Sequence, residues 1–545
     1  MSVTNFYKNV DYYLDLFDER CDAGDYPGGF AALYYAKKVA EEDDLSDIYL
    51  AAAQGYAEID RLQSSNEYYF RTLKSGLNRS EALFGLLQNM ILLNSDEAEY
   101  YAAMLATEEE EFDEEALFDI LDQAGAEQSD LRYELVYDKD EAATDRAAEC
   151  VRNGKFDEAI SILSGVLPTD KNYVKAQNDL TMCQTVKRDF EAALLAAENA
   201  LSVEPENVVA LSNKIMLSKI LKKGGNVDEF VEKLLSKKNV TPFEAAKIAT
   251  TMCDLMRHAD ARKYLLKVLE DKPYTELYML LLGIAEYNIS NFSAAKREFD
   301  KLLKIDEKDV VAKYYMRFVN KKEEEFKSGK AIEEIEYVPQ LPYAEILRLY
   351  KKVEKIVKSK NAEKFITDEE AKDAFEFMLR SGDMGALAEV CELVANSDVP
   401  QREEFLEEVL LDSTVSQGLK IRIIETLVYD KINKLYYTND LHYEEVPLKY
   451  PKGYKNLPFA YRKAYAMAIS LYAFLKSADY LKRFPSAANE IFSRFSESHK
   501  EFDSPEALAI LICKVADNKC PAKELAEALR IDEELFKLYE EKLYE

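Results

Sequence analysis

Apolar residues recur every three or four positions over most of this 545-residue chain, which is the spacing of amphipathic helices. In residues 1–107 this spacing predicts one helical hairpin over Tyr12–Ala40, followed by four short helices. Their ranges are Asp47–Asp60, Ser65–Leu77, Ser80–Leu93 and Ser95–Thr107. Glycine and asparagine mark the breaks between them. We expect hairpins here that do not keep a fixed repeat length.

A constant period appears in the middle of the chain. Four alanines, Ala159, Ala193, Ala261 and Ala295, are separated by multiples of 34 positions. The interval between Ala193 and Ala261 spans two periods. Three positions before each alanine stands an aromatic residue or a histidine: Phe156, Phe190, His258 or Phe292. The repeat between Ala193 and Ala261 has Val227 at the alanine position and is interpreted as a degenerate unit. Repeats of this length are helix pairs, so we predict five hairpins between Asp140 and Asp309.

Local signals agree with this register. Thr241-Pro242-Phe243-Glu244 is a capping box with proline at the first helical position, where the fourth hairpin should begin. The clearest unit combines Leu282-Gly283, Phe292, Ala295 and Phe299. These positions resemble the tetratricopeptide repeat (TPR) family, in which a small residue lets the second helix of each hairpin pack closely on the first. The resemblance implies an α-solenoid with five TPR repeats and a capping helix in residues 140–326, and TPR-like hairpins in residues 1–107.

The prolines of Val338-Pro339-Gln340-Leu341-Pro342 mark a boundary, because proline interrupts helices. Beyond it we predict a helical, HEAT-like domain in residues 343–433 and a C-terminal helical domain in residues 456–545. Residues 434–455 change character, and the turn Thr438-Asn439-Asp440 between aromatic runs predicts a β-hairpin followed by a loop. The predicted fold class is therefore all-α: an α-solenoid, then an irregular helical domain with one inserted β-hairpin.

The end of the chain is similar to helix-turn-helix modules and to the last helices of cyclin-box repeats. The pattern lies in Lys523–Leu535, with Glu533–Tyr544 as the candidate recognition helix. That helix is acidic and would repel phosphates. We therefore expect it to be a packing module rather than a DNA-binding one.

The net charge of −31 disfavours non-specific binding to nucleic acid or to anionic membranes. Seven carboxylates stand in Glu108–Glu115, within an acidic connector over residues 108–139. They suit the start of a solvated helix or the attraction of a basic partner. No stretch approaches the roughly 18 apolar residues of a membrane span, and the N-terminus lacks an export pattern. Seven scattered cysteines fit reduced core thiols, so we expect a cytoplasmic protein.

No residue pattern indicates catalysis. The three histidines, His258, His442 and His499, have no second ligand at metal-binding spacing, and Gly329-Lys330 lacks the other residues of a phosphate-binding loop. We expect no enzyme activity, no metal and no cofactor. An enzyme whose site is assembled only by the fold remains a third alternative.

Matching the repeat positions predicts the residues of the concave groove. The main set is Lys175, Asn178, Met182, Ser212, Met216, Lys219, Leu280, Ile284 and Tyr287, with Thr144, Ala148 and Thr250 at equivalent positions. Each of them could equally be ordinary surface. The family's carboxylate clamp is incomplete, because Val209 and Asn213 stand where the partners of Lys175 and Asn178 should be. We predict a peptide or helix as ligand, and not the acidic tail of a chaperone.

A second candidate surface follows the β-hairpin. Basic and aromatic residues alternate there without an acidic residue, at Lys449, Lys452, Tyr454, Lys455, Arg462 and Lys463. Charge and stacking of this kind suit single-stranded nucleic acid or an acidic peptide. A polar loop that leads into a helix over Phe459–Leu475 explains the same residues.

The leading hypothesis is a scaffold or adaptor that binds another protein or peptide in the TPR groove. The alternative is a transcription-linked or nucleic-acid-associated regulator that acts through the C-terminal helices and the basic loop. The sequence indicates neither the identity of the partner nor the oligomeric state.

Overall fold

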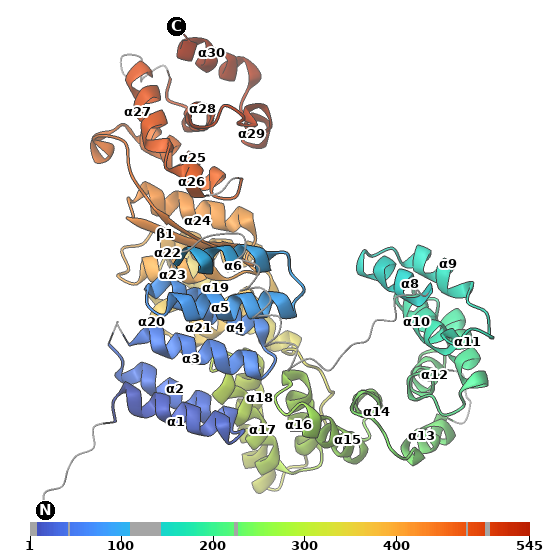
Figure 1. Cartoon of the computed structure of the whole chain (residues 1–545). Coiled ribbons are helices and arrows are strands. Elements are labelled where there is room, and N and C mark those ends of the chain that lie inside the picture. The colour runs from blue at the N-terminus through green and yellow to red at the C-terminus, as the bar shows by residue number, and fades with distance from the viewer. Residues whose placement is uncertain are drawn as a thin grey trace, which may run out of the picture. The chain divides into compact units, whose positions relative to one another are not determined.

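The computed structural model describes residues 8–41, 44–108, 143–222, 227–475, 478–495 and 502–544. Apart from Glu108, the predicted acidic connector lies outside them, as do the first seven residues and His499. The described residues form helices and one two-stranded sheet (Figure 1), which confirms the all-α fold class with an inserted β-hairpin. They divide into two compact units. One is Arg132–Leu341, and the other combines Met1–Leu131 with Pro342–Glu545.

The central unit is an array of helical hairpins, each made of two consecutive helices, and a longer helix follows the last hairpin. The helices are α8 (Ala143–Arg152), α9 (Phe156–Ser164), α10 (Tyr173–Val186), α11 (Phe190–Val203), α12 (Val208–Ile220), α13 (Val227–Ser236), α14 (Pro242–Asp254), α15 (His258–Asp271), α16 (Glu276–Asn288), α17 (Phe292–Ile305) and α18 (Val310–Lys327). The predicted capping box begins α14: Thr241 Oγ1 accepts from the Glu244 amide, and Glu244 accepts from the Thr241 amide. The expected TPR-like solenoid is thus confirmed.

Each hairpin of the array turns through one residue with positive φ. These residues are spaced by 34 positions, at Gly154, Arg188, Lys222, Met256 and Ser290. The third hairpin keeps the register although Val227 replaces its alanine. Glycine adopts this conformation without strain, but four of the five residues carry a side chain. The turn is therefore imposed by the packing of the two helices and not by the residue type.

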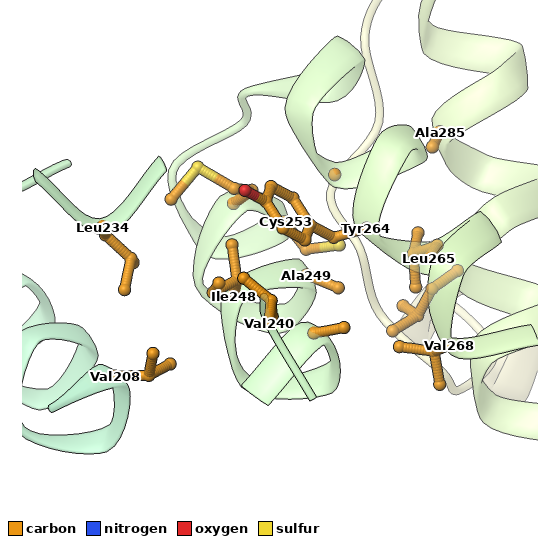
Figure 2. Packing of buried hydrophobic residues seen from close by; sticks show 14 of the residues in the cluster. Val208, Leu234, Val240, Ile248, Ala249, Cys253, Tyr264, Leu265, Val268 and Ala285 are labelled. Carbon is orange, nitrogen blue, oxygen red and sulfur yellow. The ribbon is translucent and has the colours of Figure 1, made fainter. Parts of the chain in front are cut away.

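Close approach of the paired helices depends on small residues. The four alanines of the shared register are completely buried. In the last hairpin a Cβ atom on Gly283 would lie 2.5 Å from carbons of the Phe299 ring. The core continues from one hairpin to the next, as Figure 2 shows for Leu234 of α13, Ile248 of α14 and Leu265 of α15. No hairpin of this part buries its apolar face alone.

The N-terminal helices pair in the same way. They are α1 (Val10–Asp22), α2 (Tyr26–Val39), α3 (Leu45–Glu58), α4 (Leu62–Ser75), α5 (Arg79–Leu92) and α6 (Glu97–Glu108). Positive φ angles occur at Gly24, Asp60 and Asn94 between the paired helices. Asp60 follows Gly24 by 36 positions, and Asn94 follows Asp60 by 34. The second interval keeps the 34-residue period and the first is two residues longer, so the expectation that these hairpins lose the period is wrong for the second interval.

The C-terminal part holds the sheet between two groups of helices in the sequence. Before it come α19 (Tyr343–Lys358), α20 (Lys364–Thr367), α21 (Glu369–Ser381), α22 (Met384–Ala395), α23 (Arg402–Leu411) and α24 (Gln417–Tyr429). After it come the 3-10 helix η1 (Tyr454–Asn456), α25 (Phe459–Tyr472), α26 (Ala478–Leu481), α27 (Phe484–Phe495), α28 (Pro505–Ala516), α29 (Ala522–Ala528) and α30 (Glu533–Tyr544). The acidic helix α30 buries Phe536, Tyr539 and Leu543. Tyr539 packs on Phe495 and Phe502.

The predicted β-hairpin is present, with β1 (Lys434–Asn439) antiparallel to β2 (His442–Pro447). Asn439 pairs with His442, and Asp440 adopts a positive φ in the turn. Successive side chains point to opposite faces of a strand, yet Tyr437 and Tyr443, which lie on opposite faces, are both fully buried. The hairpin is therefore covered on both sides, unlike a solvent-exposed hairpin.

One face of the hairpin packs against N-terminal helices, which are far away in the sequence. Tyr443 stacks on Phe70 of α4 at 5.9 Å between ring centroids. The Tyr100 hydroxyl of α6 donates to the Tyr443 carbonyl at 2.6 Å, and Arg79 of α5 pairs with Glu445 at 2.9 Å. On the other face, the Tyr437 hydroxyl donates to the Ala473 carbonyl. These contacts join the two ends of the chain into one compact unit.

A buried lysine fixes the hairpin to α24. Lys420 is almost fully buried, and its Nζ donates to the carbonyl and the hydroxyl of Thr438, at 2.7 Å each. Burial lowers its pKa to about 8. A buried cation needs such partners, because its desolvation is costly.

We predict that Gly283→Ala destabilises the central unit by about 1–3 kcal/mol, because the added methyl group clashes with the Phe299 ring. Chemical denaturation followed by circular dichroism measures this. The control is Gly418→Ala, in helix α24, where a Cβ meets no heavy atom within 4 Å. That change should be neutral or stabilising, since alanine favours helix. Equal effects of both changes would contradict the close-packing argument.

We predict a pH-dependent contribution from His442, whose ring stacks on Tyr100 and lies 2.8 Å from Glu97. Burial lowers its pKa, but hydrogen bonds to Glu444 and Glu97 outweigh this, and the pKa is raised above 6.5. The stabilisation is therefore fully present below pH 6.5 and is lost as the pH rises through the folded-state value. The difference in unfolding free energy between the wild type and His442→Gln should be larger at about pH 6 than at about pH 8.5. A difference that does not change with pH would contradict this assignment.

Candidate functional site

The first helices of the hairpins, α10, α12, α14 and α16, carry most of the predicted groove residues, and they also carry exposed apolar side chains. Residues that are one repeat apart occupy equivalent positions, so Met182 corresponds to Met216, Val186 to Ile220, and Phe243 to Leu277. We call these six residues the groove strip. Their exposed fractions are 45% for Met182, 54% for Val186, 48% for Ile220, 71% for Phe243 and 40% for Leu277, and Met216 is half-buried.

Sequence reasoning found Met182 and Met216 but missed the other four members. A signal was present, because Val186 and Ile220 lie one helical turn after the two methionines. Phe243 and Leu277 share the register of Lys175, two and three repeats later. What the sequence does not show is that these side chains stay exposed while neighbours of the same type are buried.

The predicted polar groove residues link neighbouring hairpins. Lys175 Nζ lies 3.4 Å from an Asp145 carboxylate oxygen in the preceding hairpin. Asn178 donates to the Asn207 side chain at 3.2 Å, and Asn207 caps α12. Lys219 donates to the Asp254 carbonyl at the end of α14 at 2.8 Å, where a cation suits the helix dipole. Lys175 and Lys219 remain exposed beside the groove strip.

Three equivalent positions, Thr144, Asn178 and Ser212, each hold a buried side-chain oxygen that has no hydrogen-bond partner among the described residues. Each is one repeat from the next, and they lie one helical turn before Ala148, Met182 and Met216. An unpaired buried oxygen costs free energy.

The last hairpin differs, because its predicted groove residues are buried. Leu280, Ile284 and Tyr287 are at most 4% exposed, and Ser212 of α12 is fully buried. These four contact their own array rather than solvent, and their binding to a partner stays a prediction. Burial raises the pKa of Tyr287 to about 12, so its hydroxyl is protonated and can donate.

The Tyr287 hydroxyl donates to the chain itself, at the Glu333 carbonyl, with a distance of 3.1 Å. Glu333 belongs to a stretch without helix or strand that follows α18. We call residues 331–338 the return segment, because they lie back against the array. Asn288 accepts from the Ile335 amide and donates to the Ile335 carbonyl, both at 2.9 Å. Part of the predicted groove is therefore occupied by the chain's own backbone.

The basic-aromatic loop is only partly open. Tyr454 is buried, and its hydroxyl donates to the Val428 carbonyl. Lys463 pairs with Glu425, and the Arg462 guanidinium lies 4.7 Å from the centre of the Tyr429 ring. The structure leaves Lys449, Lys452 and Lys455 exposed, together with Phe459, which is 62% exposed.

All seven cysteines are free thiols, and four of them are buried. Burial raises the pKa of Cys253 and Cys391 to about 12, which favours their unreactive form. Cys513 donates a hydrogen bond that lowers the pKa of Cys520, so the fold brings these two thiols together. Within the described ranges, no group of three metal-ligating side chains gathers, and no helix has the length and apolar character of a membrane span.

Comparison with solved structures finds two of low similarity. The human IFIT1 dimer with PPP-AAAA is 12% identical, with a TM-score of 0.24, over 78% of this chain and 90% of that one. Naa15/Naa10 bound to HypK-THB is 12% identical, with a TM-score of 0.16, over 98% of this chain and all of that one. No protein family and no curated protein sequence matches the chain. At this similarity the two structures carry no information about function.

Proposed function

We propose that the chain is a protein-binding scaffold whose central array binds an apolar segment of a partner along the groove strip. One observation supports this most strongly: apolar side chains are exposed on four successive first helices, from Met182 to Leu277, at two positions repeated between α10 and α12 and at a third repeated between α14 and α16. Isolated exposed apolar residues are common, but a repeated set on one side of an array is typical of an interaction surface.

The chemistry of the strip suits an amphipathic helix or an extended peptide with apolar anchors. Methionine side chains adapt to partners of different shape, and Phe243 offers a large exposed ring. The exposed Lys175 and Lys219 beside the strip favour acidic residues at the edge of the bound segment.

The proposal includes no catalysis, no cofactor and no nucleic acid. It also excludes a chaperone tail as ligand. The two residues that match a carboxylate clamp are already engaged, Lys175 with Asp145 and Asn178 with Asn207. A cytoplasmic setting fits the seven free thiols.

The test uses the full chain and a groove variant that combines Met182→Glu with Phe243→Glu. The control combines Leu195→Glu with Leu266→Glu, two exposed positions on the second helices α11 and α15. Each protein is used to capture partners from a lysate, and bound proteins are quantified by mass spectrometry. We expect the amount of each partner captured by both the wild type and the control to be at least about tenfold lower with the groove variant. Each introduced carboxylate would have to be buried against the partner, which costs free energy.

A partner set that is identical for all three proteins, or lost equally with both variants, would contradict the proposal. Because all four positions are exposed, the variants should keep the unfolding temperature of the wild type. That measurement separates a lost surface from a lost fold.

A second candidate function uses the loop after the β-hairpin. The exposed Phe459 lies edge-on to Tyr429, with Arg462 over the same tyrosine and three exposed lysines nearby in the sequence. Aromatic and basic groups in this combination suit single-stranded nucleic acid.

Our leading proposal expects no binding of a labelled single-stranded oligonucleotide, since the chain carries a charge of −31. Fluorescence anisotropy in low and high salt measures this. Salt-sensitive binding that disappears in a Lys452→Glu, Lys455→Glu variant would instead favour the second function.

A further inference from the structure

The return segment is held like a bound peptide. Side chains of the array supply hydrogen bonds to its backbone: Asn288 pairs with both main-chain groups of Ile335, and Tyr287 donates to the Glu333 carbonyl. From α18, the Tyr315 hydroxyl donates to the Val338 carbonyl at 2.9 Å. Contacts to main-chain groups do not depend on the bound residue type, and they are a recurring way to recognise extended peptides.

One side chain anchors the segment. Tyr337 packs against the apolar cluster built by α12 to α16, the cluster shown in Figure 2. Its hydroxyl lies 2.9 Å from Nδ1 of His258, which begins α15. The two rings are 5.8 Å apart between centroids. Ile332 and Ile335 are half-buried, while Glu333, Glu334 and Glu336 face solvent. Of the carboxylates, Glu334 lies 3.3 Å from Nε2 of His258.

These contacts hold the return segment less firmly than paired helices or strands are held in a fold. The segment has no helix or strand pairing, and none of its side chains is fully buried. Its attachment to α18 compensates for this, because a short tether holds a ligand at about millimolar effective concentration. A free peptide that makes the same contacts and further contacts of its own can overcome this advantage and compete with the return segment for the site.

We propose that His258, Tyr287, Asn288 and Tyr315 form a peptide-docking site whose resident ligand is the return segment. The partner is an extended acidic segment with an aliphatic residue and, two positions later, a tyrosine, as at Ile335 and Tyr337. Such a partner displaces the return segment. The inference rests on the proposed function only in assuming that the array binds protein partners. The docking site shares no residue with the groove strip.

Two substitutions in the return segment are expected to empty the site while leaving its four residues unchanged. Ile335→Pro removes the amide that donates to Asn288, and Tyr337→Ala removes the anchor. We call the double change the released variant. The probe is a fluorescein-labelled synthetic peptide with the sequence of residues 330–340, and its binding to the full chain is followed by anisotropy.

We expect the released variant to bind the peptide at least about tenfold more tightly than the wild type, whose site is filled by its own segment. Adding Asn288→Ala to the released variant should abolish the binding. A peptide with alanine in place of tyrosine serves as the control and should bind at least about tenfold more weakly. Equal affinity of the wild type and the released variant, or binding that survives Asn288→Ala, would overturn the proposal.

A second measurement covers the case in which the released variant does not fold. Hydrogen exchange of the wild type is recorded with and without excess peptide. Displacement predicts faster exchange of the Ile335 amide, which Asn288 protects in the free chain. Unchanged exchange at saturating peptide would overturn the proposal. Neither experiment involves Met182 or Phe243, so failure here and failure of the groove-strip test are separate results.

Discussion

A single helical hairpin of this chain cannot cover its own apolar face, and the rest of the structure depends on this constraint. Within a hairpin the helices approach closely because buried alanines, or Gly283 opposite Phe299, leave room for them. Between hairpins the cores are continuous, so each unit is stabilised by its neighbours. The left-handed turn residue then recurs once in every repeat, whatever its side chain. A regular array follows from one packing solution applied repeatedly.

The same constraint explains why the ends of the chain combine. The N-terminal hairpins leave an apolar face on α4 to α6, and the β-hairpin fills it with Tyr443 while Tyr437 is buried on the other side. A two-stranded hairpin is marginally stable alone, and burial of both faces removes that weakness. The central array is therefore an insertion whose two ends connect to one compact unit.

Function, in our proposal, lies where the packing is left incomplete. On α10 to α16 the groove strip keeps apolar side chains exposed that a further layer would cover. At the last hairpin the chain itself supplies that cover, with the return segment held against Tyr287 and Asn288. The two sites illustrate one principle: a repeat array offers similar surfaces in series, and local residues decide whether the surface is open or occupied.

Much of the fold could be predicted from the sequence, because it depends on local periodicity. The helices, the capping box at Thr241 and the β-hairpin follow from patterns a few residues long, and the register of the buried alanines follows from their spacing by multiples of 34 residues. The candidate site was predicted less completely. Met182 and Met216 were found by register, but the exposure of Phe243 and the burial of Ile284 depend on neighbours that no local pattern specifies.

The sequence by itself therefore determined the elements and their repeat, since hydrophobic spacing and helix-start signals act over one or two turns. Only the tertiary structure decided that Tyr443 packs on Phe70, that Asn288 holds the backbone of Ile335, and that Lys420 is buried beneath Thr438. These contacts join residues that lie well apart in the sequence, by 373 positions in the first case. Their partners are chosen by the shape and polarity of surfaces that exist only after the helices have packed.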